Sequence, residues 1–543
     1  MADQAAGQAG RRKAGDGAKS QSEYGGTNPY LIAVLVSVAT FMEVLDTTIA
    51  NVALRYISGG LAVGPDQAAW VITSYLVANA IVLCASSWLV QIFGRKNFFM
   101  ACIALFTVSS ACCGIAWSLQ SLLIFRVLQG LAGGGMTPVA QSILAAAFPP
   151  QKRAQGFSIY GIAVVLAPAI GPTLGGWLSD NFSWHWCFLI NVPVGIGSLV
   201  AIASLLPASA EKRKERRAMW RTGNIRFDLV GFLLVSTFLG ALEVVLDRGQ
   251  EDDWFGSPFI VSFSVIAAVA LVLFVPWELI QKEPLIDLRL LVSRQFGTCF
   301  LIMLGMGAIL IATTQFLPQI LQDDFGYTAT LAGLVLSPGG VVTMVMFFII
   351  GRISFIDPKF LIALGGIIIA AAMYNLTNLY GGLNFAFFAW SRVYLGIGLP
   401  LVFNSVTSAS YSGLAPTQTD QASSLINVAR NFGGSIGVSL AQTILARRTQ
   451  FHQSRLAEHV GTWNPAYGET SQQVQNYFAT KPLVGAGAGT HRTALAWIGQ
   501  QVEIQASLWA YIDVFFALML IGVMITLLAF TLRRVQTAET PAA

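Results

Sequence analysis

Residues 97–151 read NFFMACIALFTVSSACCGIAWSLQSLLIFRVLQGLAGGGMTPVAQSILAAAFPPQ, and this stretch decides the fold class. Arg126 is its only charged residue, so the stretch consists of two charge-free runs, 97–125 and 127–151. A helix needs about 20 apolar residues to cross a bilayer, whereas the strands of a membrane barrel would alternate over about 10 residues. Each run is therefore predicted to be a transmembrane helix, in which every backbone amide is satisfied within its own segment.

Charge-free runs of this kind recur along the chain, at 154–179, 181–210, 254–277, 295–322, 325–351, 360–391 and 393–419. Only 11% of the 543 residues are charged, against about 25% in soluble domains, and 55% are hydrophobic. So few charges cannot cover a soluble surface, and the net charge of +5 gives no sign of a nucleic-acid partner. The composition therefore predicts an all-α integral membrane protein.

Turn signals and polar breaks divide the chain into fourteen predicted spans, at 30–54, 68–92, 98–118, 121–148, 156–178, 187–206, 228–246, 257–279, 298–317, 329–351, 360–380, 385–413, 422–446 and 507–532. They are expected to form an N-terminal six-helix bundle at 29–206, an inserted helix pair at 227–279, and a C-terminal six-helix bundle at 280–446 and 507–532. The other segments are predicted to be a disordered cytoplasmic tail at 1–28, a basic cytoplasmic linker at 207–226, a periplasmic loop at 447–506 and a cytoplasmic tail at 533–543.

Basic residues predict the orientation. Twenty-two Lys and Arg residues lie in segments on the side of the two termini, and seven lie opposite, five of them in 447–506. By the positive-inside rule, both termini are expected in the cytoplasm. The remaining three, Arg126, Arg392 and Arg430, lie inside spans.

Short matches indicate an internal repeat of the two bundles. FRVLQG at 125–130 in span four matches SRVYLG at 391–396 in span twelve, and GRK at 94–96 after span two matches GR at 351–352 after span ten. The matches follow the order of the spans. Repeats that flank a site at the membrane midplane are typical of transporters.

Span one carries Glu43 and Asp46, which are three residues apart and so share one helix face. Two adjacent acids in an apolar span are not both charged, so at least one is expected to hold a proton near neutral pH. A proton-coupled carrier needs such an acid; a fixed structural ion pair is the alternative. Arg126, which stays charged, is the expected counter-charge of Asp46. Arg392 and Arg430 would either attract an anionic substrate or hydrogen-bond between helices.

Other function classes find little support in the sequence. The six cysteines lie in apolar stretches without a metal-binding spacing, and the four histidines lie outside the predicted spans. We therefore expect no metal, no cofactor and no enzymatic activity, since a membrane enzyme would need a convergent Ser/His/Asp group. A scaffold that docks an adaptor without transporting anything is the remaining alternative, and it would leave Asp46 and Arg126 without a purpose.

Several motifs together resemble those of the fourteen-span drug:proton antiporters of the major facilitator superfamily, of the EmrB type. They are LDTTIANVAL at 45–54, RVLQG at 126–130, GPTLGG at 171–176, LDRG at 246–249 with DWF at 253–255, and the long loop at 447–506. The loop between spans two and three departs from the superfamily pattern GxLxDRxGRK, because Ser87, Gln91 and Ile92 replace its first Gly, its Asp and its first Arg. The usual charge relay of that loop is therefore not expected.

The resemblance implies a major facilitator fold and a proton-driven exporter of hydrophobic or amphipathic drugs in the bacterial inner membrane. It also implies a tripartite efflux system with a periplasmic membrane-fusion adaptor and an outer-membrane channel. Asp46 and Arg126 would couple protons, with Glu43 as an added acid where the EmrB type has a neutral residue. The expected conformational switch comprises Gly94, Arg95, Lys96, Pro168, Gly171, Pro172, Gly175 and Gly176, and the expected substrate-binding residues are Gln129, Arg392 and Arg430. The buried cations favour fatty acids or other weak acids as the alternative substrates.

Overall fold

The computed structural model describes residues 27–149, 152–206, 228–281, 284–353, 356–415, 418–461, 463–479 and 488–533, and every regular element in these ranges is a helix. The predicted tails and basic linker lie almost wholly outside them. The long helices of the first part are α2 (Pro29–Leu61), α3 (Pro65–Phe93), α4 (Arg95–Cys113), α5 (Leu119–Ala147), α6 (Arg153–Asn181), α8 (Asn191–Leu205), α10 (Leu229–Arg248) and α11 (Pro258–Ile280). Those of the second part are α13 (Arg294–Asp323), α14 (Ala329–Arg352), α15 (Pro358–Leu376), α16 (Phe385–Ser410), α17 (Thr419–Ala457) and α19 (Ala488–Ala529). One long helix thus occupies each predicted span.

Local sequence signals set the helix ends. Ser118 and Ser121 form a reciprocal capping box at the start of α5, and Asn384 caps α16 by accepting a hydrogen bond from the Phe387 amide. Gly94 has a φ of 79°, a left-handed value that favours glycine, and it turns the chain between α3 and α4. Short helices, α7 (Trp186–Leu189) and α12 (Arg289–Val292), precede α8 and α13.

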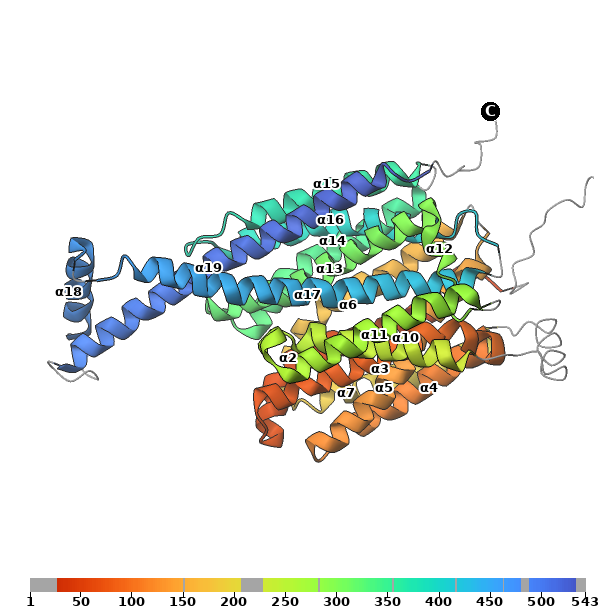
Figure 1. Cartoon of the computed structure of the whole chain (residues 1–543), viewed down its shortest axis with the longest axis horizontal. Coiled ribbons are helices and arrows are strands. Elements are labelled where there is room, and N and C mark those ends of the chain that lie inside the picture. Colours follow the sequence, from red (N-terminus) through yellow and green to blue (C-terminus); the bar gives the residue numbers. More distant parts are fainter. Residues whose placement is uncertain are drawn as a thin grey trace, which may run out of the picture.

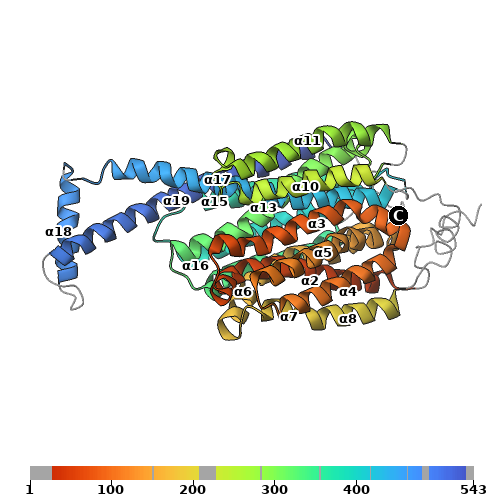
Figure 2. The same ribbon diagram turned by 60° about the horizontal axis from the view of Figure 1, so that its bottom comes forward.

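The long helices form two six-helix bundles, one of α2–α6 with α8 and one of α13–α17 with α19 (Figures 1 and 2). The bundles meet along α6 and α14, and also where α17 packs on α3 and α5. The inserted pair, α10 and α11, packs on α3 of the first bundle and reaches α17 of the second. We call the end where α2 begins and α19 ends the terminal side, and the opposite end the distal side.

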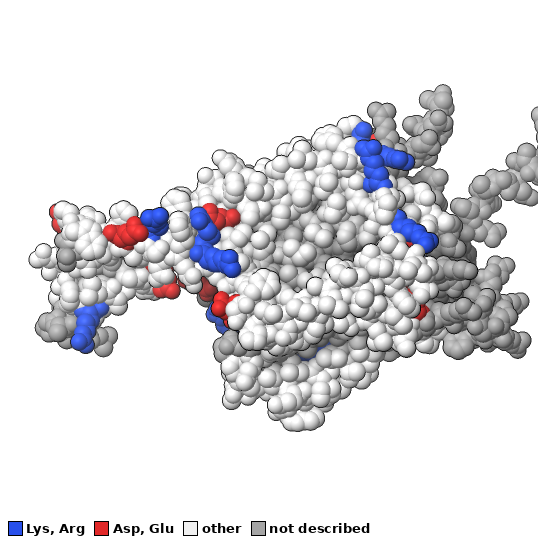
Figure 3. All heavy atoms as spheres, in the orientation of Figure 1, with Lys and Arg blue, Asp and Glu red and all other residues white. Residues whose placement is uncertain are grey.

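The described helices fit a protein that crosses the membrane many times. Twelve of them are long and apolar enough to span a bilayer, or thirteen if α6, which bends by 43° beyond Pro168, is counted as one span. The helix α17 is as long but does not pass on composition, because serine, asparagine and arginine side chains interrupt it. Lys, Arg, Asp and Glu gather toward the two ends of the visible surface and leave the band between them uncharged (Figure 3). The arrangement is compatible with the fourteen predicted spans.

The segment 447–506, predicted as a loop, is largely helical where the structure describes it. The helix α17 continues to Ala457, α19 begins at Ala488, and α18 (Pro465–Ala479) lies across their ends beyond both bundles (Figure 1). Asp513 joins the two long helices near the base of this extension, because it accepts hydrogen bonds from Arg448 Nε at 2.6 Å and from His452 Nε2 at 2.9 Å. The prediction did not include these helices because it located helices by their apolar residues. Polar residues end an apolar span, but they do not end the helix.

Candidate proton-coupling site and bundle interface

The core of the first bundle holds Asp46 by three hydrogen bonds to its carboxylate. Its Oδ2 lies 2.6 Å from Arg126 Nη1, and its Oδ1 accepts hydrogen bonds from Gln129 Nε2 at 2.8 Å and Asn191 Nδ2 at 2.7 Å. The Asp46 and Arg126 side chains are both 0% exposed. Residues of α2, α5 and α8 therefore meet at one carboxylate. The helix α3 joins them indirectly, because it contacts Arg126.

The guanidinium of Arg126 is held on several sides. Its Nε donates to the Val71 carbonyl at 3.0 Å and its Nη1 to Gln129 Oε1 at 3.0 Å, while its charge lies 4.3 Å from the centre of the Tyr75 ring. A second ring, that of Phe188, lies 5.5 Å away. A buried guanidinium requires such partners because it cannot lose its proton. The predicted pairing of Arg126 with Asp46 is present in this conformation.

Glu43 lies one turn before Asp46, and neutral groups make all its hydrogen bonds in the described part of the chain. Its Oε2 accepts from Thr137 Oγ1 at 2.8 Å, and its Oε1 receives weaker contacts from Asn79 at 3.4 Å and from the Tyr75 hydroxyl at 3.5 Å. Tyr75 therefore touches both Glu43 and Arg126. The two acids form one connected site with different partners, and Glu43 is the less strongly bound of the two.

Gln129, which was predicted to bind substrate, contacts both Asp46 and Arg126 in this structure. Gln129 is one helical turn after Arg126 on α5, so both side chains point at Asp46. Asn191 was not singled out from the sequence, although it donates to Asp46 and also, at 3.1 Å, to Ser110 Oγ. An amide at the start of an otherwise apolar span was the only signal for it.

The other two buried cations lie apart from Asp46. Arg430, on α17 at the bundle interface, contacts Asn431 Oδ1 at 3.2 Å and, at 3.5 Å, the Tyr160 hydroxyl of α6. Arg392, inside the second bundle, donates to Thr313 Oγ1 at 3.2 Å, and its Nε lacks a partner among the described residues. Neither is paired with an acid within the described ranges.

On the terminal side an ion pair joins the two bundles. Arg95, at the start of α4, reaches Asp420 of α17 with two parallel contacts, Nε to Oδ1 at 3.0 Å and Nη2 to Oδ2 at 3.1 Å. Ser142 of α5 also donates to this carboxylate. The acid that the loop lacks at Gln91 is thus supplied from the other bundle. Sequence reasoning missed Asp420 because nothing local links it to Arg95.

Further inter-bundle hydrogen bonds follow one face of α17. Ser423 donates to the Pro138 carbonyl at 2.5 Å, Ser424 to the Leu83 carbonyl at 2.5 Å, and Asn427 to Gln141 Oε1 at 2.8 Å. These residues recur every three or four positions, so they form a polar stripe on the helix. The stripe begins at Asp420 and closes the terminal half of the interface.

The other predicted switch residues join helices of the first bundle. Lys96 donates to the carbonyl oxygens of Ala203 at 2.9 Å and of Leu206, at the end of α8. On α6, which contains Pro168 and Pro172, a side chain at Gly171 would clash with Thr48, and one at Gly175 would crowd the Ile49 backbone; Gly176 is buried beside them. These glycines let α6 approach the helix that carries Asp46.

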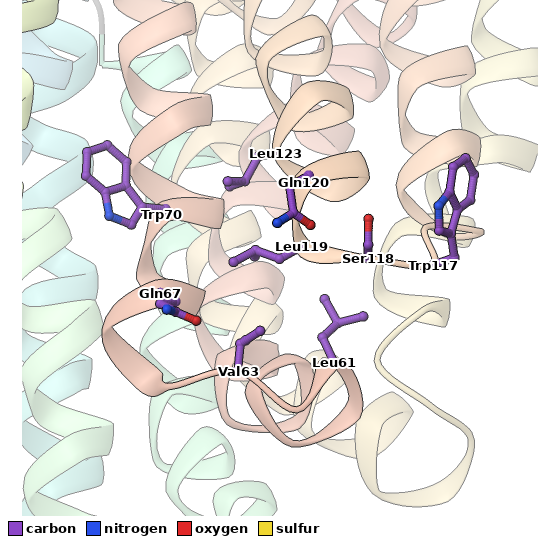
Figure 4. A pocket seen from close by; sticks show the side chains of 9 residues that line it. All are labelled: Leu61, Val63, Gln67, Trp70, Trp117, Ser118, Leu119, Gln120 and Leu123. Carbon is purple, nitrogen blue, oxygen red and sulfur yellow. The ribbon is translucent and has the colours of Figure 1, made fainter.

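Two cavities accompany these elements. The larger, of about 380 Å³, opens between the distal ends of α2, α3 and α5, where Trp70 and Trp117 stand at opposite sides of Gln120 (Figure 4). It is lined by none of the predicted site residues. The smaller, beside Arg392, measures about 10 Å³, which is no larger than the space of one water molecule.

Comparisons with known proteins bear on the family and the fold of the chain. Residues 36–438 match the family described as Major Facilitator Superfamily. The chain is 36% identical over 517 residues to "Multidrug export protein EmrB" of Escherichia coli (strain K12), covering 94% of this chain and 96% of that protein. It is 37% identical over 442 residues to "Fatty acid resistance protein FarB" of Neisseria gonorrhoeae, covering 81% and 85%. The solved structure of the proton:xylose symporter XylE has a similar fold, with a TM-score of 0.54 at 13% identity over 90% of this chain and 96% of that one.

Proposed function

The chain belongs to the major facilitator superfamily, and from that premise we propose that it is a proton-driven antiporter that exports hydrophobic or amphipathic drugs. The observation that carries this proposal is the fully buried Asp46 of α2, whose carboxylate is bound by Arg126 and Gln129 of α5 and by Asn191 of α8. A carboxylate at this depth is costly unless it is paired. Protonation of Asp46 would release Arg126, so a proton changes the packing of the helices that meet there.

The bundle interface suggests how this change reaches the substrate path. Contacts between α17 and the first bundle close the terminal side here, which supports an outward-facing arrangement with the terminal side cytoplasmic. Thr173 of α6 packs against Gly333 of α14, while Gly171 on the same helix packs against Thr48 of α2. The bent helix α6 therefore touches the proton-coupling helix and the opposite bundle together. We assign Gly94, Arg95, Lys96 and the Pro168–Gly176 segment to this switch.

The alternative substrate class is fatty acids or other weak acids. Arg430 at the interface and Arg392 in the second bundle make their hydrogen bonds to neutral groups among the described residues, and an anionic substrate would supply a direct ion pair. The similarity to a protein named for fatty acid resistance favours the same class. Transport of quinolone-like weak acids and of lipophilic cations is measured side by side. Preference for the weak acids would favour the anionic substrate class, and preference for the cations would count against it.

The test of proton coupling is Asp46→Asn in inside-out vesicles, with each probe class added to the external medium, because export then carries the probe into the lumen. We expect substrate movement driven by a pH gradient to be abolished, because Asn cannot exchange a proton. The control is Glu503→Gln, which neutralises an exposed acid of α19 and should leave transport unchanged. Gradient-driven movement at the wild-type rate in Asp46→Asn would refute the coupling role. Glu43→Gln in the same assay shows whether the second acid takes part.

We further propose that the protein lies in the bacterial inner membrane with cytoplasmic termini and works with a periplasmic adaptor and an outer-membrane channel. The distal extension of α17, α18 and α19 supports this, because it projects beyond the bundles and exposes Trp463 and Tyr477. Deleting 465–479 is expected to weaken co-purification with the adaptor while leaving the membrane bundles folded. Unchanged co-purification would place the adaptor contact elsewhere.

A further inference from the structure

The inserted helix pair carries a buried acid that the mechanism above does not use. Glu243 of α10 is 3% exposed, and among the described residues its one hydrogen-bond partner is Ser435 of α17, whose Oγ lies 2.6 Å from Glu243 Oε1. This contact links the inserted pair to the second bundle. A charged carboxylate with a single neutral partner is costly inside a membrane, so the neutral acid is favoured.

The hydrogen atoms at Ser435 lead to the same conclusion. Its Oγ lies within hydrogen-bond distance of two acceptors, Glu243 Oε1 at 2.6 Å and the Asn431 carbonyl at 3.3 Å. A serine hydroxyl has one hydrogen to donate. If Glu243 carries a proton, it donates to Ser435 and Ser435 donates to Asn431, so both contacts are made. If Glu243 is charged, the Ser435 hydrogen goes to Glu243 and the Asn431 contact is lost.

No neighbouring helix offers Glu243 a cation at short range in the described chain. On α10 itself, Asp247 is one turn away and Arg248 pairs with Glu251 and Asp252. The helix α3 has no charged residue after Asp66, and the sole charge on α11 is Glu278, near its terminal end. On α17 the charges before Ser435 are Asp420, held by Arg95, and Arg430, five residues back.

Glu243 and Ser435 lie on parts of the molecule that separate if the two bundles move apart during transport. The inserted pair packs on the first bundle through α10. Thr73 of α3 donates a hydrogen bond to Asp247 of α10, and the Arg248 guanidinium lies 5.5 Å from the centre of the Trp70 ring of α3. Ser435 belongs to the second bundle. When α17 leaves the first bundle, the Glu243–Ser435 contact breaks and Glu243 faces the opening between the bundles.

A chain of polar contacts also leads from Ser435 toward Glu43. Asn431, one turn before Ser435, donates to Asn79 Oδ1 at 3.4 Å, and Asn79 donates to Glu43 Oε1 at 3.4 Å. Asparagine amides do not pass protons on, so this chain transmits a change of position or charge and not a proton. Changes at Glu243 and at the central acids are therefore physically connected.

We propose that Glu243 is a proton-binding site of the transport cycle in addition to the site of Asp46 and Glu43. It holds a proton while it contacts Ser435, and it releases that proton to the cytoplasmic side when α17 withdraws; a proton from the periplasmic side restores the acid when the contact re-forms. This proposal rests on the proposed antiport function, because it assumes that the two bundles separate on the terminal side.

The test is infrared spectroscopy of the full-length protein in liposomes during a pH titration, since protonated carboxyl groups have their own C=O stretching band. We expect Glu243→Gln to lose one such band, and Ser435→Ala to keep it at a higher frequency because its hydrogen bond is gone. Asp46→Asn is the matched control and should retain the Glu243 band. In Asp420→Asn, where the terminal contact is weakened, the Glu243 band should lose intensity at unchanged pH.

Two results would overturn the proposal. Identical carboxylic-acid spectra for the wild type and Glu243→Gln would show that Glu243 is charged, and a band of equal intensity in Asp420→Asn would show that its proton is structural. The transport assay of Asp46→Asn is independent of both. If Asp46→Asn transports at the wild-type rate, the proposed antiport function is refuted, whereas the infrared result on the protonation of Glu243 still stands.

Discussion

Weakening the Arg95–Asp420 pair should open the terminal side of the transporter. The pair is bidentate, with contacts of 3.0 and 3.1 Å, and its side chains are only 11% and 16% exposed. Exposed pairs contribute about 0.2–1 kcal/mol, whereas breaking a buried pair costs about 3–5 kcal/mol. An intermediate cost of about 2 kcal/mol corresponds to a roughly 30-fold shift of the outward–inward equilibrium. Asp420→Asn is the smallest substitution that removes the charge.

Distances between spin labels on the two bundles measure this shift. The labels are attached to cysteines introduced at Phe93, at the end of α3, and at Phe360, at the start of α15, which are both exposed on the terminal side. Cys112, the one native cysteine that is not fully buried, is replaced beforehand so that it is not labelled. Asp420→Asn should increase the population with a long distance, whereas Arg352→Ala, which removes the exposed counterpart cation of the second repeat, should not. An unchanged distance distribution in Asp420→Asn would refute the role of this pair as a lock.

Two further predictions concern packing and pH. Gly171→Ala should lower the temperature of thermal unfolding, because overpacking against Thr48 costs about 1–3 kcal/mol. The control is Gly197→Ala, which has open space around it and should be neutral or stabilising. Equal effects of the two substitutions would contradict the close contact of α6 and α2. Asp324, just after α13, has a pKa raised to about 6, mainly because burial disfavours its charge, although Ser507 donates to it. The folded state therefore binds this proton more tightly than the unfolded chain does, and Asp324 favours folding below its ordinary pKa of about 3.9 and loses that contribution as the pH rises to about 6. In Asp324→Asn, the change in the free energy of unfolding across that pH window should be smaller by about 1 kcal/mol, after allowance for solvent exposure. An unchanged dependence of this free energy on pH would contradict the raised pKa.

The sequence by itself determined the class of fold and the centre of the site. Long charge-free runs permit only membrane helices, because the bilayer offers no water to backbone groups, and one long helix follows each predicted span. Charges inside the predicted spans are rare and costly, so Glu43, Asp46 and Arg126 stood out, and the Asp46–Arg126 contact is present in the structure. Gln129 was noticed as a substrate-binding residue, but its contact with Asp46 was not predicted, because the direction of its side chain relative to Asp46 depends on where α2 lies.

Only the tertiary structure decided which distant polar residues meet. Asp420 and Arg95 are 325 residues apart, and Glu243 and Ser435 are 192 apart, so no local pattern links either pair. Serine, asparagine and single acids in apolar helices are ambiguous in one dimension, since each is satisfied by its own helix or by any neighbour. The packing of α17 against α3, α5 and α10 removes that ambiguity, because it fixes which face of each helix is turned to another helix and which to lipid. Glu43, Asp46 and Arg126 were therefore identified from the sequence as costly charges, but Glu243 was not, and the packing determined the partners of all four.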